Sequence, residues 1–337
     1  MLNFDEDRYL RIQSGAVGLA DRIHAEVERA LDDGAENLFF LGSGGAGILM
    51  EPAARLLQER STFPVHHVMP AELVVRGSVH LGPQSLVVVP SLSGTTTESV
   101  EALRWCRERG ARVITLTGFI GVPLADEADV NLVNEAADDT SCESFYLQAL
   151  LVALSLMHLR DEYNGYAETL AQLTTLPALL LEAKRAFEPR AAEYAASIRD
   201  EPFHIITGAG ATWPQAFYYG MCILEEMQWI RTRPVHASDF FHGTLELVEA
   251  GVSVILLKGE DASRPLVERV EKFAPGYTEK VCVLDSADVD LPGVPQEVRS
   301  LVSQVVLAAL LERISAHLEV LRDHPLTTRR YYKRVAY

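Results

Sequence analysis

Residues 85–103 read SLVVVPSLSGTTTESVEAL, and this stretch decides the fold class. An uninterrupted apolar run, Val87–Val89, is followed by several hydroxyl side chains, and a pattern typical of a helix begins at Glu98. A continuous apolar run that leads directly into a helix indicates a strand of a parallel sheet covered on both faces. We therefore expect a strand at 85–90, a polar loop, and a helix at 98–109.

The same alternation of short apolar segments and helical patterns continues on both sides of this stretch. We expect further strands at 37–42, 63–69, 111–118, 130–133, 202–210, 252–259 and 279–285, and helices ending near residue 34 and at 46–60, 143–198, 213–230, 264–273 and 298–321. The series restarts near residue 202, which indicates a weak internal repeat of two α/β units. We place a first domain at 1–198, with a leading helix and a helical connector, and a second at 199–337, with a C-terminal tail.

The composition restricts the possible partners. The 337 residues are 48% hydrophobic and carry a formal net charge of −17, which argues against a nucleic-acid partner. No apolar run approaches the roughly 18 residues needed to cross a bilayer, and the N-terminus has no apolar segment typical of a signal peptide. The four cysteines are scattered along the chain and form no CxxC pair, which indicates reduced thiols. We expect a cytoplasmic protein without a membrane partner.

A glycine loop follows the predicted strand at 37–42. Gly42, Gly44 and Gly47 have the spacing of the dinucleotide-binding fingerprint. That function also needs an acidic residue at the end of the next strand, where FPVHHVMP offers only histidines. A nicotinamide enzyme is therefore disfavoured, and a tight strand-to-helix turn without a ligand is the ordinary alternative.

The loop after residue 90 is a candidate phosphate site. Four hydroxyl side chains surround Gly94: those of Ser91, Ser93, Thr95 and Thr96. Backbone N–H groups at a helix N-terminus bind anions, and glycine allows a ligand to approach the backbone closely. An ordinary capped helix, with Thr95 and Glu98 as a capping box, explains one or two of the hydroxyls. Four of them at the carboxyl end of a strand favour a phosphate cradle.

Three segments resemble the sugar isomerase (SIS) domain family: SLSGTTTES at 91–99, LGSGGAG at 41–47 and VPLADEADV at 122–130. The resemblance implies flavodoxin-like parallel sheets, usually two domains per chain, and a phosphorylated sugar as ligand. It assigns phosphate binding to Ser91, Ser93 and Thr96, and contacts near the sugar to Ser43, Gly44 and Ser141. The family often has Gln between the two serines, where this chain has Leu92.

The second half carries CILEEMQWIRTRPVHASDFFHGTLELVE at 222–249. Glu226 precedes His242 by sixteen residues, a spacing that resembles the catalytic Glu and His of the isomerase half of glucosamine-6-phosphate synthase. EEMQW, FFHG and the tail HPLTTRRYYKRVAY resemble the fructosamine-6-phosphate deglycase branch more closely. The synthase has a lysine three positions before the Glu, where this chain has Ile223.

The resemblance implies that a carboxylate moves a proton between C1 and C2 of a fructosamine 6-phosphate, and that the resulting imine is hydrolysed. We assign the shuttle to Glu226 and proton transfer at the ring oxygen or O2 to His242. Neighbours on a helix point about 100° apart, so one of the adjacent acids Glu225 and Glu226 is expected to face solvent. The resemblance, through its spacing, selects Glu226 as the acid in apolar surroundings. His242, beside a glycine, is equally typical of a turn residue. This chemistry requires neither a metal nor an organic cofactor.

Two other functions remain open: an aldose–ketose phosphate isomerase or synthase-like enzyme that uses the same Glu and His, and a non-catalytic phosphosugar sensor. The amine half of the substrate is not identified by the sequence. SIS tails often reach the active site, which makes His324 a substrate-binding candidate. The basic tail is either a solvated end or an interface arm. The family also implies a homodimer or higher homo-oligomer with shared active sites.

Overall fold

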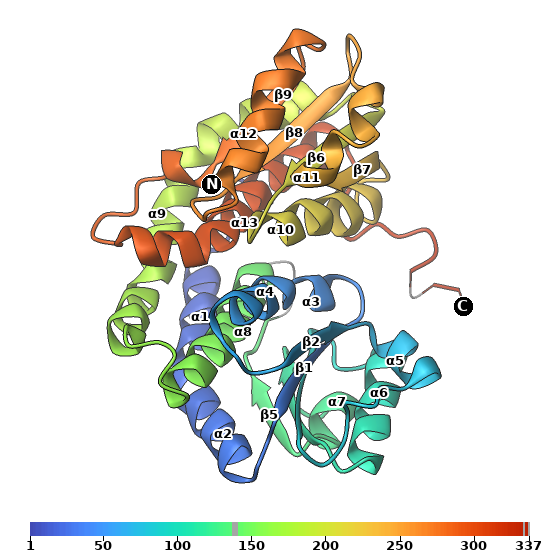
Figure 1. Cartoon of the computed structure of the whole chain (residues 1–337). Helices are drawn as coiled ribbons and strands as arrows, with labels where there is room; N and C mark the ends of the chain where they lie inside the picture. The colour runs from blue at the N-terminus through green and yellow to red at the C-terminus, as the bar shows by residue number, and fades with distance from the viewer. Residues whose placement is uncertain (137–140, 333, 336–337) are drawn as a thin grey trace. The chain divides into compact units, whose positions relative to one another are not determined.

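The computed structural model describes residues 1–136, 141–332 and 334–335 (Figure 1). Contacts divide the chain into two compact units. One is Glu6–Ala178, and the other is Leu179–Tyr337 together with Met1–Asp5. Helix α9 (Tyr166–Ile198) begins in the first unit and ends in the second. The domain boundary expected after residue 198 coincides with the end of this helix and stays a prediction.

The first unit contains a five-stranded parallel sheet in the order β2-β1-β3-β4-β5 (Figure 1). Its strands are β1 (Asn37–Leu41), β2 (Val65–Val68), β3 (Ser85–Ser91), β4 (Arg112–Thr117) and β5 (Val130–Val133). This is the flavodoxin-like strand order, which places ligands at the carboxyl ends of the strands. Every residue of the central strand β3 is buried, as its continuous apolar run predicts.

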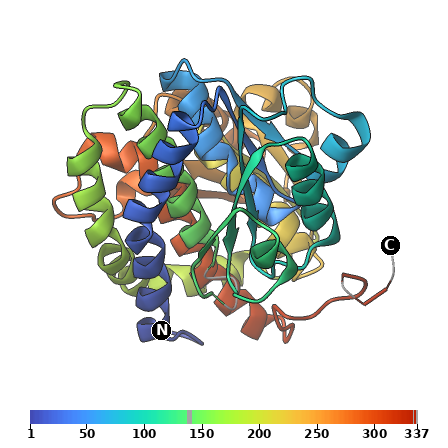
Figure 2. The ribbon, with the colours of Figure 1, turned by 90° about the horizontal axis from the view of Figure 1, so that it is seen from below.

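Helices cover both faces of this sheet. They are α1 (Glu6–Gly18), α2 (Ala20–Asp32), α3 (Gly45–Ile48), α4 (Glu51–Arg60), α5 (Pro70–Arg76), α6 (Thr97–Glu108), α7 (Pro123–Asp126) and α8 (Ser141–Leu159). Helices α1, α2 and α4 pack on α8, and α1 and α8 lie side by side in both ribbon views (Figures 1 and 2). On the other face of the sheet, α6 packs on α5 and α7 and on the apolar side chains of β3 and β4.

The second unit repeats this plan with a four-stranded parallel sheet in the order β7-β6-β8-β9. Its strands are β6 (Phe203–Gly208), β7 (Arg231–His236), β8 (Ser253–Lys258) and β9 (Val281–Asp285). The order matches the first four strands of the other sheet, so the fold class of two α/β units is confirmed. Strand β7 was not predicted, because RTRPVH is charged and contains Pro234. Proline is tolerated there because β7 is an edge strand.

The helices of the second unit include one that differs from its prediction. They are α10 (Thr212–Tyr218), the π-helix η1 (Tyr219–Glu225), α11 (Ala237–Phe240), α12 (Arg264–Phe273) and α13 (Gln296–Leu321), with short 3-10 turns at Thr244–Leu247, Ala274–Gly276 and Ser286–Asp288. The single helix expected at 213–230 is thus an α-helix that continues as a π-helix and ends in a turn. After α13, the described residues of the tail, 322–332 and 334–335, form no helix or strand (Figure 2).

Two helices bear on the expectation that the protein has no membrane partner. Cys142–Leu159 of α8 and Gln296–Leu321, which is α13, are long and apolar enough to cross a bilayer by length and composition. In each helix, 89% of the most apolar 18-residue stretch is buried inside the protein. Helices that are apolar on all sides also occur in the cores of large proteins, and the burial of these two indicates that role.

Candidate active site

The loop after β3 forms the first candidate site. The Ser91 hydroxyl accepts a hydrogen bond from the Gly94 N–H at 3.1 Å, which closes a tight turn. The Ser93 hydroxyl accepts hydrogen bonds from the Thr95 N–H at 3.4 Å and the Thr95 hydroxyl at 3.1 Å. Gly94 has a φ of +62°, and a Cβ at this position would lie 2.3 Å from Cγ2 of Val122. The turn therefore requires glycine.

Helix α6 begins directly behind this turn, and the expected capping box is not formed. The N-cap residue is Thr96 and not Thr95, and no described side chain caps the helix. The N–H groups of the first turn of an α-helix have no partner within the helix, and the helix dipole makes this end positive. The loop thus combines serine and threonine hydroxyls with an uncapped helix terminus, which is the chemistry of a phosphate site.

The glycine loop after β1 lies beside this turn, because β1 and β3 are adjacent parallel strands. The Ser43 hydroxyl is 3.4 Å from the Ser99 hydroxyl in the first turn of α6. A Cβ on Gly47 would lie 2.1 Å from the Gly42 carbonyl oxygen, so these two glycines serve close packing of the loop on itself. Gly44 has a φ of +56° with no other atom within 4 Å of an added Cβ, so its backbone borders open space.

Five candidate residues lie at one edge of the first sheet, and their role in binding stays a prediction: Ser43, Gly44, Ser91, Ser93 and Thr96. The sixth, Ser141, begins α8, and its side chain lies outside the described part of the chain, as do Asp138 and Asp139.

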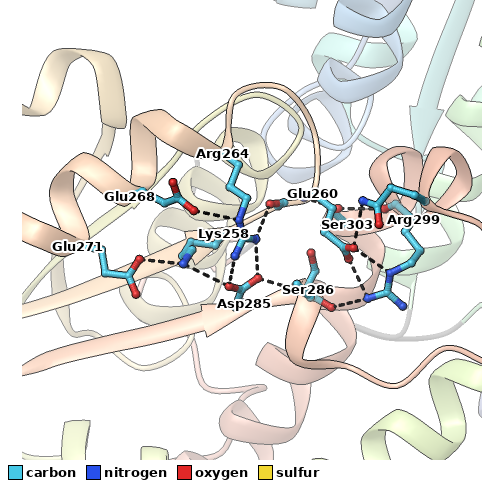
Figure 3. Close-up of polar contacts among 12 residues, drawn as sticks. Lys258, Glu260, Arg264, Glu268, Glu271, Asp285, Ser286, Arg299 and Ser303 are labelled. Carbon is cyan, nitrogen blue, oxygen red and sulfur yellow. Dashed lines mark hydrogen bonds and ion pairs between the residues drawn. The ribbon is translucent and has the colours of Figure 1, made fainter.

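The corresponding edge of the second sheet is closed by ion pairs (Figure 3). Lys258, at the end of β8, bonds to Glu271 at 2.7 Å and to Asp285, at the end of β9, at 3.2 Å. Arg264 binds both oxygens of Asp285, at 2.8 and 2.5 Å. Burial by itself would raise the pKa of Asp285, but the hydrogen bonds from Arg264, the Ala287 N–H and Lys258 outweigh it and lower this pKa. The network thus stays ionised.

A carboxylate also occupies the donors that could hold an anion at this edge. Asp261 accepts hydrogen bonds from the Ala211 N–H at 2.9 Å and the Ser263 N–H at 2.7 Å. At this edge the second unit thus has the negative charge of Asp261, where the first unit has a hydroxyl-rich loop. The described residues at this edge of the second sheet form no counterpart of the hydroxyl-rich loop around Gly94.

The π-helix of the second unit positions a second candidate site. The Glu226 N–H donates to the Met221 carbonyl at 3.1 Å, five residues back, where an α-helix would use the residue four back. The chain then turns sharply, and Trp229 adopts a left-handed φ of +56°. Such strain in a residue other than glycine is most often found at functional sites. The turn also separates the adjacent acids: Glu225 accepts from the Thr232 hydroxyl at 2.6 Å, while Glu226 points elsewhere.

Glu226 lines a cavity of about 940 Å³ that is formed within the second unit. The walls come from the segment before β6, from the turn after the π-helix, and from the C-terminal tail. Arg329 of the tail donates to the Glu226 carboxylate at 2.9 Å and is itself held by the carbonyls of Leu326 and Thr328. The Glu226 side chain is 31% exposed. The prediction that Glu226 has apolar surroundings is therefore wrong, because the Arg329 guanidinium contacts its carboxylate.

The two predicted histidines lie in different surroundings. His242 is exposed, follows α11, and donates its backbone N–H to the Asp239 carbonyl at 2.9 Å. It is not among the residues that line the cavity of Glu226. His324 packs edge-on against Trp229 with the ring centroids 4.5 Å apart, and its carbonyl accepts from the Gln228 side chain. His324 thus supports the cavity wall. Among the described residues, no group of three or more His, Cys, Asp or Glu is arranged to hold a metal ion.

Comparison with known proteins assigns the family. The SIS domain model matches residues 34–158. Fructosamine deglycase FrlB of Bacillus subtilis is 30% identical over 322 residues, which cover 94% of this chain and 98% of that protein. This chain belongs to the SIS domain family. Within the family it is related to the deglycase branch: fructoselysine 6-phosphate deglycase of Escherichia coli is 24% identical over 92% of this chain and 89% of that protein.

Two solved structures share the fold of this chain. A protein from Bacillus subtilis described as a phosphosugar isomerase superposes with a TM-score of 0.89 at 29% identity, over 96% of this chain and 99% of that one. A second, from Salmonella typhimurium, has a TM-score of 0.88 at 28% identity, over 96% and 97% of the two chains. The cradle loop lies inside the segment matched by the SIS model, and Glu226 lies beyond it.

Sequence reasoning missed the two residues that shape the Glu226 cavity. Arg329 was considered only as part of a solvated end or an interface arm, and Trp229 was expected within a regular helix. One signal for Arg329 was available: a cluster of basic residues in a chain of net charge −17 indicates a specific acidic contact. No signal for the left-handed turn at Trp229 exists in the local pattern.

Proposed function

We propose that this chain cleaves fructosamine 6-phosphates to glucose 6-phosphate and a free amine. The observation that carries the proposal is the Glu226 carboxylate, which opens onto a cavity and is fixed there by Arg329. The deglycase names of its relatives support this reaction among the alternatives. The cradle at Ser91–Thr96 supplies the donors that a sugar phosphate would need.

The reaction begins with proton transfer at C1. Glu226 removes a proton from C1, the C1–C2 bond becomes double, and O2 takes a proton from an acid, which gives an enaminol. Glu226 then returns its proton to C2, and the nitrogen lone pair forms a C1–N double bond. Water adds to this iminium at C1 and the C–N bond breaks, which releases glucose 6-phosphate, the amine and one proton. A single carboxylate can serve both carbons, because they are neighbours.

The other candidate residues take supporting roles in this proposal. Ser91, Ser93 and Thr96 bind the phosphate, and Ser43 and Gly44 contact the sugar, with Ser141 as a further contact. His242 moves the proton at O2 or at the ring oxygen, and His324 borders the substrate cavity. No step in this scheme calls for a metal or an organic cofactor. No disulfide joins any of the four cysteines, which all lie in the described part of the chain, and this supports the proposed cytoplasmic location.

The two alternative functions are less well supported. Synthase-type amine transfer uses a lysine that is replaced here by Ile223, a buried apolar residue. A phosphosugar sensor has no use for a carboxylate held in a cavity by a dedicated cation. An aldose–ketose phosphate isomerase uses the same proton shuttle between C1 and C2. Its substrate differs in having no amine at C1.

One experiment separates these functions. The full chain is incubated with fructoselysine 6-phosphate, and separately with fructose 6-phosphate, while glucose 6-phosphate is followed in a coupled assay. A deglycase releases glucose 6-phosphate and an equal amount of lysine from the first substrate only. Release from fructose 6-phosphate alone supports the isomerase, and no release from either supports the sensor.

We also propose that the protein is a homodimer or higher oligomer with shared active sites. The exposed position of His242, away from the cavity lining of its own unit, suits a role in the site of a neighbouring subunit. Mixing inactive Glu226→Gln protein with inactive His242→Ala protein, followed by subunit exchange, is then expected to restore about half of the activity per mixed dimer, because one site receives both intact residues. Mixtures that stay inactive, although mixed dimers form, contradict the sharing.

A further inference from the structure

The cavity beside Glu226 is lined by arginines of which only some form ion pairs or hydrogen bonds within it. Four arginines line it: Arg231, Arg322, Arg329 and Arg330. Arg329 is paired with Glu226, and Arg322 donates to the carbonyls of Arg199 and Gln228. Among the described residues, no carboxylate pairs with Arg231 or Arg330. Two acids of the same wall form ion pairs with other cations, Glu201 with Lys280 and Asp200 with Arg199. Glu225 accepts a hydrogen bond from the Thr232 hydroxyl and keeps its negative charge.

Arg330 is the better oriented of the two unpaired cations. Its guanidinium carbon lies 3.8 Å from the centre of the Trp229 ring, the geometry of a cation–π contact. The left-handed backbone of Trp229 and the edge contact with His324 hold the indole in place. Stacking uses the face of the guanidinium and leaves its N–H groups free to bind a carboxylate through two parallel hydrogen bonds.

We propose that Arg330 is the residue that binds the carboxylate of the amine half of the substrate, and that it sets the preference for amines that carry a carboxylate. This inference rests on the proposed deglycase function and adds to it the residue that recognises the amine half. Arg330 follows Arg329, which contacts the Glu226 carboxylate, so its position suits the part of the substrate beyond the C1–N bond. The cavity volume leaves room for an amino acid next to a sugar carbon.

The test compares two substrates that differ only in the carboxylate: fructoselysine 6-phosphate and its decarboxylated analogue, the fructosyl-cadaverine 6-phosphate. The intact protein is expected to show a kcat/KM about tenfold to a hundredfold higher for the lysine compound, as expected for a charged hydrogen-bonded pair. Arg330→Gln is expected to bring the ratio of the two kcat/KM values close to one. Arg330→Lys, which keeps the charge but loses the planar fork, is expected to give an intermediate ratio.

Arg233→Gln is the matched control. Arg233 is an exposed arginine of the edge strand β7, and it does not line the cavity. It is expected to preserve the ratio of the intact protein. Melting temperatures are compared first, so that unfolding is not mistaken for lost recognition. A ratio near one in the intact protein, or a ratio that survives Arg330→Gln, overturns the inference while the deglycase function stands. If neither compound is cleaved, the proposed function fails, and this inference fails with it.

Discussion

Glu226→Gln is expected to lower kcat for fructoselysine 6-phosphate by at least about 10²- to 10⁴-fold, the usual contribution of a positioned general base. The amide has the shape of the carboxylate but cannot take a proton from C1. The fold is expected to persist, because the side chain is 31% exposed and its known partner is a residue of the tail. Glucose 6-phosphate release measures turnover, and the thermal shift produced by fructose 6-phosphate measures retained binding.

A second measurement identifies the step that is lost. In D2O, the native enzyme is expected to exchange the C1 hydrogen of the bound substrate with solvent, which NMR detects as loss of the C1 proton signal. Glu226→Gln is expected to stop this exchange. Glu225→Gln is the matched control, because the adjacent carboxylate is bonded to Thr232, and we expect it to cost less than about tenfold. Full turnover or continued C1 exchange in the Glu226 variant would show that another group is the base.

The second large effect is expected at the cradle. In Gly94→Ala, the new Cβ would lie 2.3 Å from Cγ2 and 3.0 Å from Cβ of Val122, and the φ of +62° adds about 1–2 kcal/mol of strain. The loop must shift, which separates the hydroxyls from the N-terminus of α6. Because each charged hydrogen bond contributes about 1.5–3 kcal/mol, losing two of them is expected to weaken the binding of fructose 6-phosphate at least about a hundredfold. Titration calorimetry measures the change in Kd.

Two variants make this result interpretable. Gly34→Ala has a φ of +90° but no atom within 4 Å of the new Cβ, so it carries the backbone strain without the overlap and is expected to bind normally. Ser91→Ala removes only the hydroxyl that accepts from the Gly94 N–H, and is expected to weaken binding to a lesser degree. If Gly94→Ala and Ser91→Ala both fold and bind fructose 6-phosphate as the native protein does, the phosphate is not held by this loop.

The fold and the position of the hydroxyl-rich loop around Gly94 could be predicted because they depend on neighbours in the sequence. Buried parallel strands are continuous apolar runs, so β3, β4, β6 and β8 were found from their side chains alone. The hydroxyls around Gly94 lie in one loop, and the strand that precedes them determines where that loop lies. Strand β7 was missed because an edge strand needs no apolar run and tolerates proline.

The arrangement around Glu226 was decided by the tertiary structure. Arg329 is 103 residues away from Glu226 in the sequence, and only the packing of the tail against the second unit brings them to 2.9 Å. The π-helix and the left-handed Trp229 leave no mark on the hydrophobic pattern, because they change hydrogen bonds and not residue types. The sequence by itself determined two parallel α/β units and a hydroxyl-rich loop around Gly94, since local periodicity and turn chemistry specify these. The partner of the acid and the shape of its cavity depend on contacts between distant segments, which no local pattern contains.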